Sequence, residues 1–493
     1  MNTKPEPRVT LDPENWDEFR SLAHRMVDDA LDYLQNVRER PAWQPMPAEV
    51  RDSFAAAVPQ RGADAAEVYA DFKQRIMPYT NGNIHPRFWG WVQGTGTPLG
   101  VMADMLASAM NPHMAGFNQA PAFVEAEVLR WIAELMGYPE SASGLLVTGG
   151  TMANILALAV ARHAKSGFDI RQSGLQGGGA KLLVYGSAEI HNWAFKGMEF
   201  IGMGREALRT VPVNADYAMD LHALREMLQR DRAAGHRPIC LIGTAGTVNT
   251  GAFDDLEAMA EMAREHDLWF HVDGAFGAWA RISPQYRQLA AGMEKSDSLG
   301  LDLHKWISLP FECAGFLVRD SRLHREAFAS TASYLTQYER GVMAGGLRFA
   351  NLGLDLTRGF KALKIWMQFK VHGVEHFARV IEQNIQDVEY LAERIRQSDE
   401  LELLAPAPLN IVCFRFVRPG LSEGELNQLN TELLLQIQEQ GIAVPSATTL
   451  NGKFALRVAN VNHRSTRSDF DEFLNAVLRL GREIEAGSRQ MAR

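Results

Sequence analysis

Short apolar runs alternate with amphipathic stretches from about residue 85 to residue 350, and this rhythm limits the folds open to the chain. For example, "GLLVTGG" precedes "TMANILALAVARHA", and "PICLIGTAG" precedes "DLEAMAEMAREHD". The apolar runs have the length of buried strands, and the stretches between them repeat apolar residues at helical spacing. Strands that alternate with helices form a mainly parallel sheet covered on both faces. The sequence therefore predicts an α/β domain.

Two further segments flank this region. Residues 15–40 carry apolar side chains at helical spacing, such as Phe19, Leu22 and Met26, before the prolines of "ERPAWQPMP" end the helix. Because such an arm has little to bury its apolar stripe against locally, we expect it to pack on another domain or on a second subunit. Near the other end, "LNIVCFRFV", a helix and "FALRVANV" predict a small α+β unit. The expected parts are an N-terminal helical arm (1–84), a large α/β domain (85–370) and a small C-terminal α+β domain (371–493).

Composition narrows the classes of function. The net charge of -9 argues against nucleic-acid binding, which rests on clustered Lys and Arg, and favours a small-molecule ligand. Cys240, Cys313 and Cys413 are widely spaced, which indicates neither a disulfide framework nor a zinc site. We find no export signal and no apolar run long enough to cross a membrane, so we expect a cytoplasmic protein.

The segment "GLLVTGGTMANILALAVAR" runs from an apolar strand through Gly149, Gly150 and Thr151 into a helix. Glycines let a backbone approach an anion closely, and the free N–H groups at a helix N-terminus can bind phosphate. An ordinary strand-to-helix turn is the alternative. The segment has neither the GK[ST] of a Walker loop nor the GxGxxG spacing of a dinucleotide fold.

Asp273 follows the apolar run of "LWFHVDGAFGAWA", at the carboxyl end of a predicted strand. Ligands of open α/β sheets bind at this edge, and a carboxylate there could pair with a protonated ring nitrogen. Ala275 is small enough to let a flat ring lie against the strand end. A loop-capping Asp, or an Asp paired with an Arg, is the alternative.

Lys305 and His191 follow two other predicted strands, in "SDSLGLDLHKW" and "KLLVYGSAEIHNW". A partly desolvated lysine can lose its proton and form an imine with a carbonyl, although a surface lysine would look the same in sequence. An imidazole can stack on an aromatic cofactor, although a hydrogen-bonded core histidine is the usual alternative. A phosphate turn, a stacking ring, a carboxylate and an imine-forming lysine on one sheet edge together indicate pyridoxal 5'-phosphate.

With these residues assembled, the chain resembles the pyridoxal-phosphate-dependent group II amino acid decarboxylases, which include the aromatic-L-amino-acid, glutamate, histidine and diaminobutyrate decarboxylases. The likeness runs in order through "HPRFWGW", "GVMADMLASAMN", "TGGTMANILALAVAR", "GTVNTGAFDDL", "WFHVDGAFGAW", "DSLGLDLHKW", "RGFKALKIWMQFKVHGVEHF" and "FALRVANVNHRST". It implies the pyridoxal-phosphate fold type I (aspartate aminotransferase-like), and a homodimer with active sites at the subunit interface.

The resemblance also implies roles for single residues. Lys305 matches the lysine that bonds to the cofactor, Asp273 the partner of the ring nitrogen, and His191 the stacking histidine. The other implied contacts are the phosphate turn (Gly150, Thr151, Met152), Thr247, Ala275 beside the ring, His304 before the lysine, and the substrate pocket (Trp91, Val92, Gly94).

Two departures from the family pattern concern the reaction outcome. Val248 stands where a second threonine usually follows "GT", so one contact to the substrate or ring is lost or moved. Counting back from "RGFKALK" places Phe349 where many decarboxylases carry the tyrosine that protonates the product. Some relatives with Phe there convert the amino acid to an aldehyde with oxygen, so this activity is the alternative to simple decarboxylation. Tyr338 or His191 could supply the proton instead.

The substrate is expected to be an aromatic L-amino acid, because Phe88, Trp89 and Trp91 lie near the implied pocket, although clustered aromatics also pack cores. An aminotransferase or a lyase could reuse the same cofactor residues. Arg457 could then hold a substrate carboxylate, or else lie in a surface ion pair. A catalytically silent scaffold is a further alternative, against which the presence of Lys305 counts.

Overall fold

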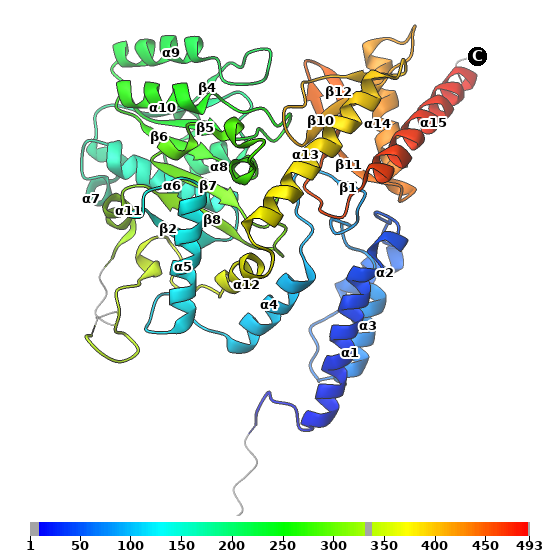
Figure 1. Cartoon of the computed structure of the whole chain (residues 1–493), viewed down its shortest axis with the longest axis horizontal. Coiled ribbons are helices and arrows are strands. Elements are labelled where there is room, and N and C mark those ends of the chain that lie inside the picture. Colours follow the sequence, from blue (N-terminus) through cyan, green and yellow to red (C-terminus); the bar gives the residue numbers. More distant parts are fainter. Residues whose placement is uncertain (1–8, 331–337, 492–493) are drawn as a thin grey trace, which may run out of the picture.

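A seven-stranded sheet forms the centre of the computed structural model, which describes residues 9–330 and 338–491 (Figure 1). Five neighbouring strands of this sheet are parallel, and β8 runs antiparallel between β7 and β2. The mainly parallel sheet predicted from the sequence is confirmed. In spatial order the strands are β2 (Ser143–Val147), β8 (Ala314–Val318), β7 (Ser298–Asp302), β6 (Trp269–Asp273), β5 (Arg237–Thr244), β3 (Leu182–Ser187) and β4 (Leu208–Val211).

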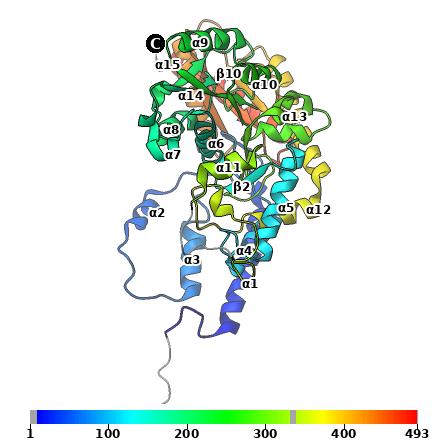
Figure 2. The same cartoon turned by 90° about the vertical axis from the view of Figure 1, so that its left-hand side faces the viewer.

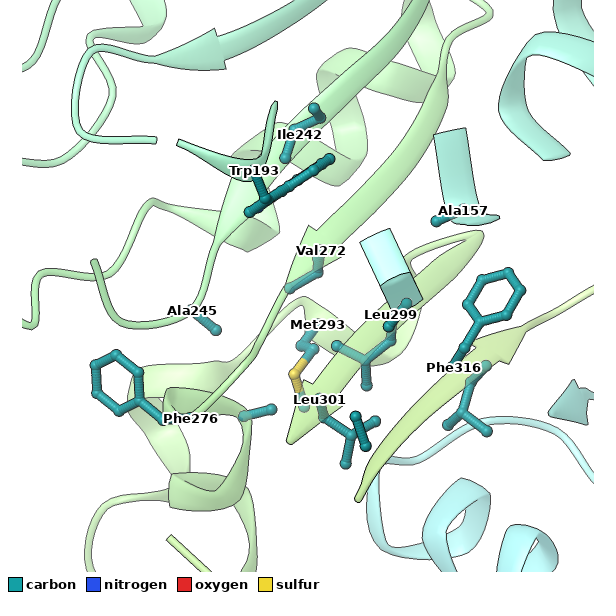
Figure 3. Packing of buried hydrophobic residues seen from close by; sticks show 14 of the residues in the cluster. Ala157, Trp193, Ile242, Ala245, Val272, Phe276, Met293, Leu299, Leu301 and Phe316 are labelled. Carbon is teal, nitrogen blue, oxygen red and sulfur yellow. The ribbon is translucent and has the colours of Figure 1, made fainter. Parts of the chain in front are cut away.

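The strands at the centre of this sheet are buried along their whole length. Every residue of β6, β7 and β8 is buried, although successive side chains point to opposite faces. Both faces must therefore be covered, as expected for a largely parallel sheet. Figure 3 shows the packing around Val272, Leu299 and Phe316, which belong to three adjacent strands.

Helices between the strands provide this cover. Helix α6 begins at the glycine turn after β2 and packs across the sheet, against β5, β6, β7 and β8. The helices of this part are α4 (Pro98–Met110), α5 (Ala120–Leu135), α6 (Gly150–Lys165), α7 (Ile170–Ser173), α8 (Trp193–Phe200), α9 (Leu221–Ala233), α10 (Leu256–Glu265), α11 (Ser321–Phe328) and α12 (Ala362–His372).

A second, five-stranded sheet carries the C-terminal part of the chain. Its strands are β1 (Phe88–Trp89), β11 (Val444–Leu450), β12 (Lys453–Ala459), β10 (Ile411–Phe416) and β9 (Leu401–Leu403), packed with α13 (Val374–Arg396), α14 (Glu423–Glu439) and α15 (Arg467–Met491). Phe88 and Trp89 lie inside the predicted large domain in sequence, but they pair in parallel with β11. The segment before the first strand of the large sheet thus joins the C-terminal unit.

The N-terminal arm consists of α1 (Trp16–Gln35), the short α2 (Ala48–Asp52) and α3 (Ala65–Arg75), and Figure 2 shows α1 and α3 extending away from the two sheets. The hydroxyl of Tyr69 in α3 donates to Asp29 in α1 at 2.7 Å, and Lys73 pairs with the same carboxylate at 2.8 Å. Many apolar side chains on the arm and on α4 remain exposed: Trp16, Phe19, Leu31, Val68, Phe72, Ile76, Met105, Leu106 and Met110. In the described residues, no helix is both long and apolar enough to span a membrane.

Candidate active site

A cavity of about 500 Å³ opens where the parallel strands of the large sheet end. The strand register explains why distant residues meet there, since Thr244 of β5 lies opposite Asp273 of β6, which in turn lies opposite Gly300 of β7. The lining residues are Trp91, Val92, Gln93, Gly149, Gly150, Thr151, Asn154, His191, Trp193, Thr244, Gly246, Val248, Asp273, Ala275, Phe276, Asp302, His304, Lys305 and Phe311. Carboxyl ends of five strands, β2, β3, β5, β6 and β7, therefore converge on one ligand-sized space.

Asp273 is held rigidly at the end of β6. Its Oδ2 accepts a hydrogen bond from Trp193 Nε1 at 2.6 Å, and its Oδ1 accepts one from the backbone N–H of Ala275 at 3.1 Å. The side chain is buried. Because two donors fix the carboxylate, it presents a negative charge in one orientation, which suits pairing with a cationic ring nitrogen.

Lys305 reaches the same cavity from the turn after β7. Its Nζ lies 3.0 Å from Oδ2 of Asp302, three residues earlier, which is buried and lines the cavity as well. The charged neighbour of this lysine is thus a carboxylate rather than a second cation. His304, between them in sequence, has Nδ1 2.8 Å from the carbonyl oxygen of Cys313 and its ring stacked obliquely on Phe311, with centroids 4.8 Å apart.

His191 lies beyond β3 at the solvent-accessible side of the cavity. Its Nδ1 accepts the backbone N–H of Trp193 at 3.1 Å, so a neutral ring carries its proton on Nε2. Desolvation by the surrounding protein lowers the pKa of His191, and the charge of Lys305 lowers it further, while Asp273 and Asp302 act in the opposite direction. A neutral imidazole with one N–H is therefore the form present at neutral pH.

The glycine turn before α6 provides the place for an anion. Gly149 is the N-cap of this helix, and α6 begins at Gly150, whose first-turn N–H groups have no acceptor within the helix. A Cβ on Gly150 would lie 3.0 Å from Asp302 Oδ2 and 3.4 Å from the Cβ of Ala275. Only glycine leaves this approach to the backbone open, as the sequence pattern suggested.

Nine of the residues expected at the site line the cavity: Lys305, His191, Asp273, Gly150, Thr151, Ala275, His304, Trp91 and Val92. Gly94 lies behind the lining, and a Cβ there would come within 1.8 Å of the carbonyl oxygen of His304. Met152 packs half-buried against the core of the large domain. The Thr247 hydroxyl lies 3.0 Å from that of Thr250 and accepts the N–H of Ala252, so it is engaged within its own loop.

Phe349 lies in a different place from the cavity within this chain. It is buried beside a second cavity, of about 680 Å³, that Leu129, Leu317 and Leu352 also line. The guanidinium of Arg358 lies 5.5 Å from the centre of its ring. Tyr338 is exposed, and residues 331–337 of the same loop lie outside the described residues. Within the described part of this chain, Phe349 therefore does not line the cavity that contains Lys305.

Sequence reasoning missed several residues that support the site. Trp193 orients Asp273, and Asp302 pairs with Lys305. Asn154, in the second turn of α6, has its Oδ1 3.0 Å from Nε2 of the buried His271. A polar residue on the inner face of α6 and a histidine two positions before Asp273 were visible signals, because residues two apart in a strand share a face.

Among the described residues, Arg457 is buried and neither lines the cavity nor lies in a surface ion pair. Its guanidinium donates to the backbone carbonyls of Asn249 at 3.0 Å, Trp91 at 2.9 Å and Val248, and to Ser446 Oγ at 3.0 Å. Burial lowers its pKa to about 10. With its donors committed to backbone oxygens, Arg457 supports two wall segments of the cavity and is poorly placed to hold a substrate carboxylate.

Three buried polar atoms at the cavity have no hydrogen-bond partner within the described part of the chain: Asn154 Nδ2, Thr244 Oγ1 and Asp302 Oδ1. Unpaired buried polar atoms are costly, and a polar ligand would supply partners for the amide of Asn154 and the hydroxyl of Thr244. The cavity contains an amine nucleophile, a fixed carboxylate, an imidazole N–H and an anion-binding turn. Pyridoxal 5'-phosphate requires these four groups, so the residues present fit this cofactor.

Comparisons with known proteins agree with this chemistry. The family model described as the pyridoxal-dependent decarboxylase conserved domain matches residues 47–417. An aromatic-L-amino-acid decarboxylase of Bacillus atrophaeus is 30% identical, over 95% of this chain and 96% of its own length. A phenylacetaldehyde synthase of Arabidopsis thaliana is 28% identical, over 91% and 93%. The crystal structure of an Oryza sativa TDC with PLP and tryptamine superposes with a TM-score of 0.88 at 25% identity, covering 96% of this chain and all of that one.

Proposed function

Because this chain belongs to the pyridoxal-dependent decarboxylase family, we propose that it converts an aromatic L-amino acid to the corresponding amine and carbon dioxide. The observation that carries the proposal is the convergence of Lys305, Asp273 and His191 on one cavity beside the α6 turn. Its cofactor is pyridoxal 5'-phosphate, which when bound supplies an electron sink for the charge left on the α-carbon as carbon dioxide departs.

The chain's own residues have separable tasks in this reaction. Lys305 would hold the cofactor through its amine. Asp273, fixed by Trp193 and by the N–H of Ala275, provides the negative charge that keeps a ring nitrogen protonated. His191 holds a proton on Nε2 at the accessible side of the cavity, where it can stack on the ring and contact the substrate.

The walls of the cavity support an aromatic substrate. Trp91, Val92, Val248 and Phe311 line it with apolar surface, and Trp91 and Phe311 are each more than half exposed within this chain. A carboxylate or ammonium on the substrate's side chain would lose its hydration against this surface without gaining a partner. The relatives named for aromatic substrates give independent support for the same class.

A substrate panel tests this proposal. Purified holoenzyme is given L-tryptophan, L-tyrosine, L-phenylalanine, L-glutamate and L-2,4-diaminobutyrate, and carbon dioxide and amine are measured. We expect turnover of at least one aromatic amino acid with a kcat/KM well above that for the two charged substrates. Turnover confined to glutamate or diaminobutyrate would reject the aromatic assignment and leave the decarboxylase reaction intact.

A second outcome of the same reaction rests on Phe349, which stands where the resemblance implies a proton-donating tyrosine, and on the similarity to a phenylacetaldehyde synthase. Oxygen-dependent conversion to an aldehyde would release ammonia and peroxide with carbon dioxide. We expect amine equal to carbon dioxide. Peroxide and ammonia equal to carbon dioxide would replace our assignment with the aldehyde reaction.

We also propose that the enzyme works as a homodimer in the cytoplasm. The exposed apolar residues of α1, α3 and α4 support a dimer, because such a surface is stable in water when a second copy covers it. Cys240, Cys313 and Cys413 are buried free thiols, which suits a reducing compartment. Sedimentation of the full chain at twice the monomer mass is the expected result.

A further inference from the structure

Asp302 is the one buried carboxylate of the cavity, within the described residues, that lacks a complete set of hydrogen bonds. Its Oδ2 pairs with Lys305 Nζ at 3.0 Å, and Nε2 of His304 lies 3.8 Å away. Its Oδ1 has no partner, whereas both oxygens of Asp273 are hydrogen-bonded. A buried carboxylate with one unpaired oxygen is under-stabilised, so its placement calls for a functional explanation.

The carboxylate of Asp302 lies against the turn that is expected to hold the cofactor's phosphate. A Cβ on Gly150 would lie 3.0 Å from Oδ2 and 3.3 Å from Oδ1. Both oxygens therefore lie close to the first residue of α6. The N-terminal end of a helix attracts a negative charge, and it attracts a phosphate for the same reason. A carboxylate and a phosphate at this place would compete for the same positive potential.

Lys305 adds to this competition. In the chain without cofactor, its ammonium is balanced by Asp302, so the cavity offers an arriving phosphate a neutral pair rather than a free positive charge. The bound phosphate must then lie near a carboxylate that is buried and little screened by salt.

We propose that Asp302 is an internal competitor of the cofactor's phosphate, which neutralises Lys305 in the free enzyme and weakens cofactor binding by repelling the phosphate group. This inference rests on the cofactor assignment above. Asp302 acts here on binding, and no covalent step is assigned to it. Because binding is weakened, the fraction of enzyme that holds cofactor would depend on the cofactor concentration.

The test uses apoenzyme and two probes that differ only in the phosphate, pyridoxal 5'-phosphate and pyridoxal, with inorganic phosphate as a third. Dissociation constants of the two aldehydes are read from quenching of tryptophan fluorescence, since Trp91 and Trp193 line the cavity, and that of inorganic phosphate from its competition with pyridoxal 5'-phosphate. In Asp302→Asn we expect pyridoxal 5'-phosphate and inorganic phosphate to bind roughly tenfold more tightly, as removal of one nearby like charge implies. Binding of pyridoxal should change by less than about threefold, because it lacks the phosphate charge.

Two further variants control this result. Asp302→Ser removes the charge without adding an amide donor, so it should reproduce the gain if repulsion is the cause. Asp104→Asn breaks another lysine–aspartate pair, with Lys364 at 3.1 Å, in which Asp104 does not line the cavity. It should leave all three constants unchanged. Circular dichroism and thermal unfolding establish that each variant is folded, and either Asp302 variant suffices for the comparison.

Each other result overturns the inference. Weaker phosphate binding in both Asp302 variants would make the carboxylate a support for the phosphate. Equal changes for pyridoxal and pyridoxal 5'-phosphate would mean that Asp302 acts only through Lys305, and a gain in the Asn variant alone would belong to the new amide. Failure of the wild-type chain to bind pyridoxal 5'-phosphate at all would instead reject the cofactor assignment, so the two failures are distinct.

Discussion

The cavity and the N-terminal arm differ in how many of their side chains find partners within a single chain. In the cavity, Asp273 is bound through both oxygens, and Lys305 is paired with Asp302. On the arm, Trp16 is 58% exposed and Phe72 is 39% exposed, with more apolar residues beside them on α1 and α3. Both Asp273 and Lys305 thus have partners within their own fold, while the arm leaves much of its apolar surface in water.

The residues that line the cavity and the exposed apolar residues of α1 and α3 therefore lie in separate parts of the chain. The cavity is built from strand ends inside one hydrophobic core, so its geometry follows from the fold of one chain. The arm contacts the C-terminal unit just after α1, where Arg38 pairs with Asp469 at 2.6 Å. Substitutions should therefore be able to damage one region while leaving the other intact.

The largest effect is expected from Lys305→Ala, which strikes only the cavity. Loss of the tethering amine should reduce turnover to the detection limit and remove the covalent cofactor adduct that borohydride fixes, as read by mass spectrometry. The variant should keep the mass of the wild-type assembly. Lys361→Ala, on a partly exposed lysine paired with Glu312 at 3.5 Å, serves as the control. A persistent adduct in Lys305→Ala would disprove the assignment of the lysine.

A smaller effect, in the opposite region, is expected from Phe72→Glu on α3. Loss of one buried aromatic side chain from a subunit interface should weaken the dimer by about 10- to 100-fold, with the added charge increasing the effect. Analytical ultracentrifugation over a range of concentrations measures this change. Gln74→Glu adds the same charge at an exposed polar position of the same helix and should change little. An unchanged dimer in Phe72→Glu would place the interface elsewhere.

The smallest effect concerns the loss of stability in acid. We expect it to come from a buried histidine of the large α/β domain rather than from the arm. Burial lowers the pKa of His324 from 6.5 to about 4, and its ring contacts Ser143 Oγ at 2.6 Å and the carbonyl of Leu352 at 2.8 Å. Between pH 6.5 and about pH 4, His324 is therefore protonated in the unfolded chain but neutral in the folded chain. The stabilisation is complete above pH 6.5 and is lost as the pH falls toward 4, by up to roughly 3 kcal/mol.

Urea unfolding at pH 7 and pH 5 measures this loss. His324→Gln, which can keep both hydrogen bonds without titrating, should reduce the fall in the free energy of unfolding. His24→Gln on the exposed face of α1 should leave the fall as it is in the wild type. If both variants reduced the fall in the free energy of unfolding equally, the acid sensitivity could not be assigned to the buried His324.

The sequence predicted the sheet and much of the cavity for one physical reason. Asp273 ends a strand, Lys305 and His191 each follow one, and the carboxyl ends of parallel strands meet at one edge. Weak separate signals thus became one site. The cofactor and the decarboxylase family predicted from the residues and the resemblance are confirmed by the family match and by the relatives.

The parts that sequence could not supply depend on loop paths and side-chain directions. Asp302 is an unremarkable strand-end residue until the turn after it brings Lys305 back to 3.0 Å. Trp193 looks like a core residue at the start of a helix, yet its indole N–H fixes Asp273. The pairing of Phe88 with Val444 joins segments far apart in the chain through a two-residue strand, too short to leave a pattern. Such contacts follow from packing rather than from periodicity.

The position of Arg457 in β12 has a consequence for how the enzyme is made. β12 follows every residue that lines the cavity in the sequence, yet its arginine holds the carbonyls of Trp91 and Val248. A nascent chain that has left the ribosome only as far as the large sheet already contains Lys305 but lacks this brace. Translation must therefore pass β12 before this cavity wall can be braced.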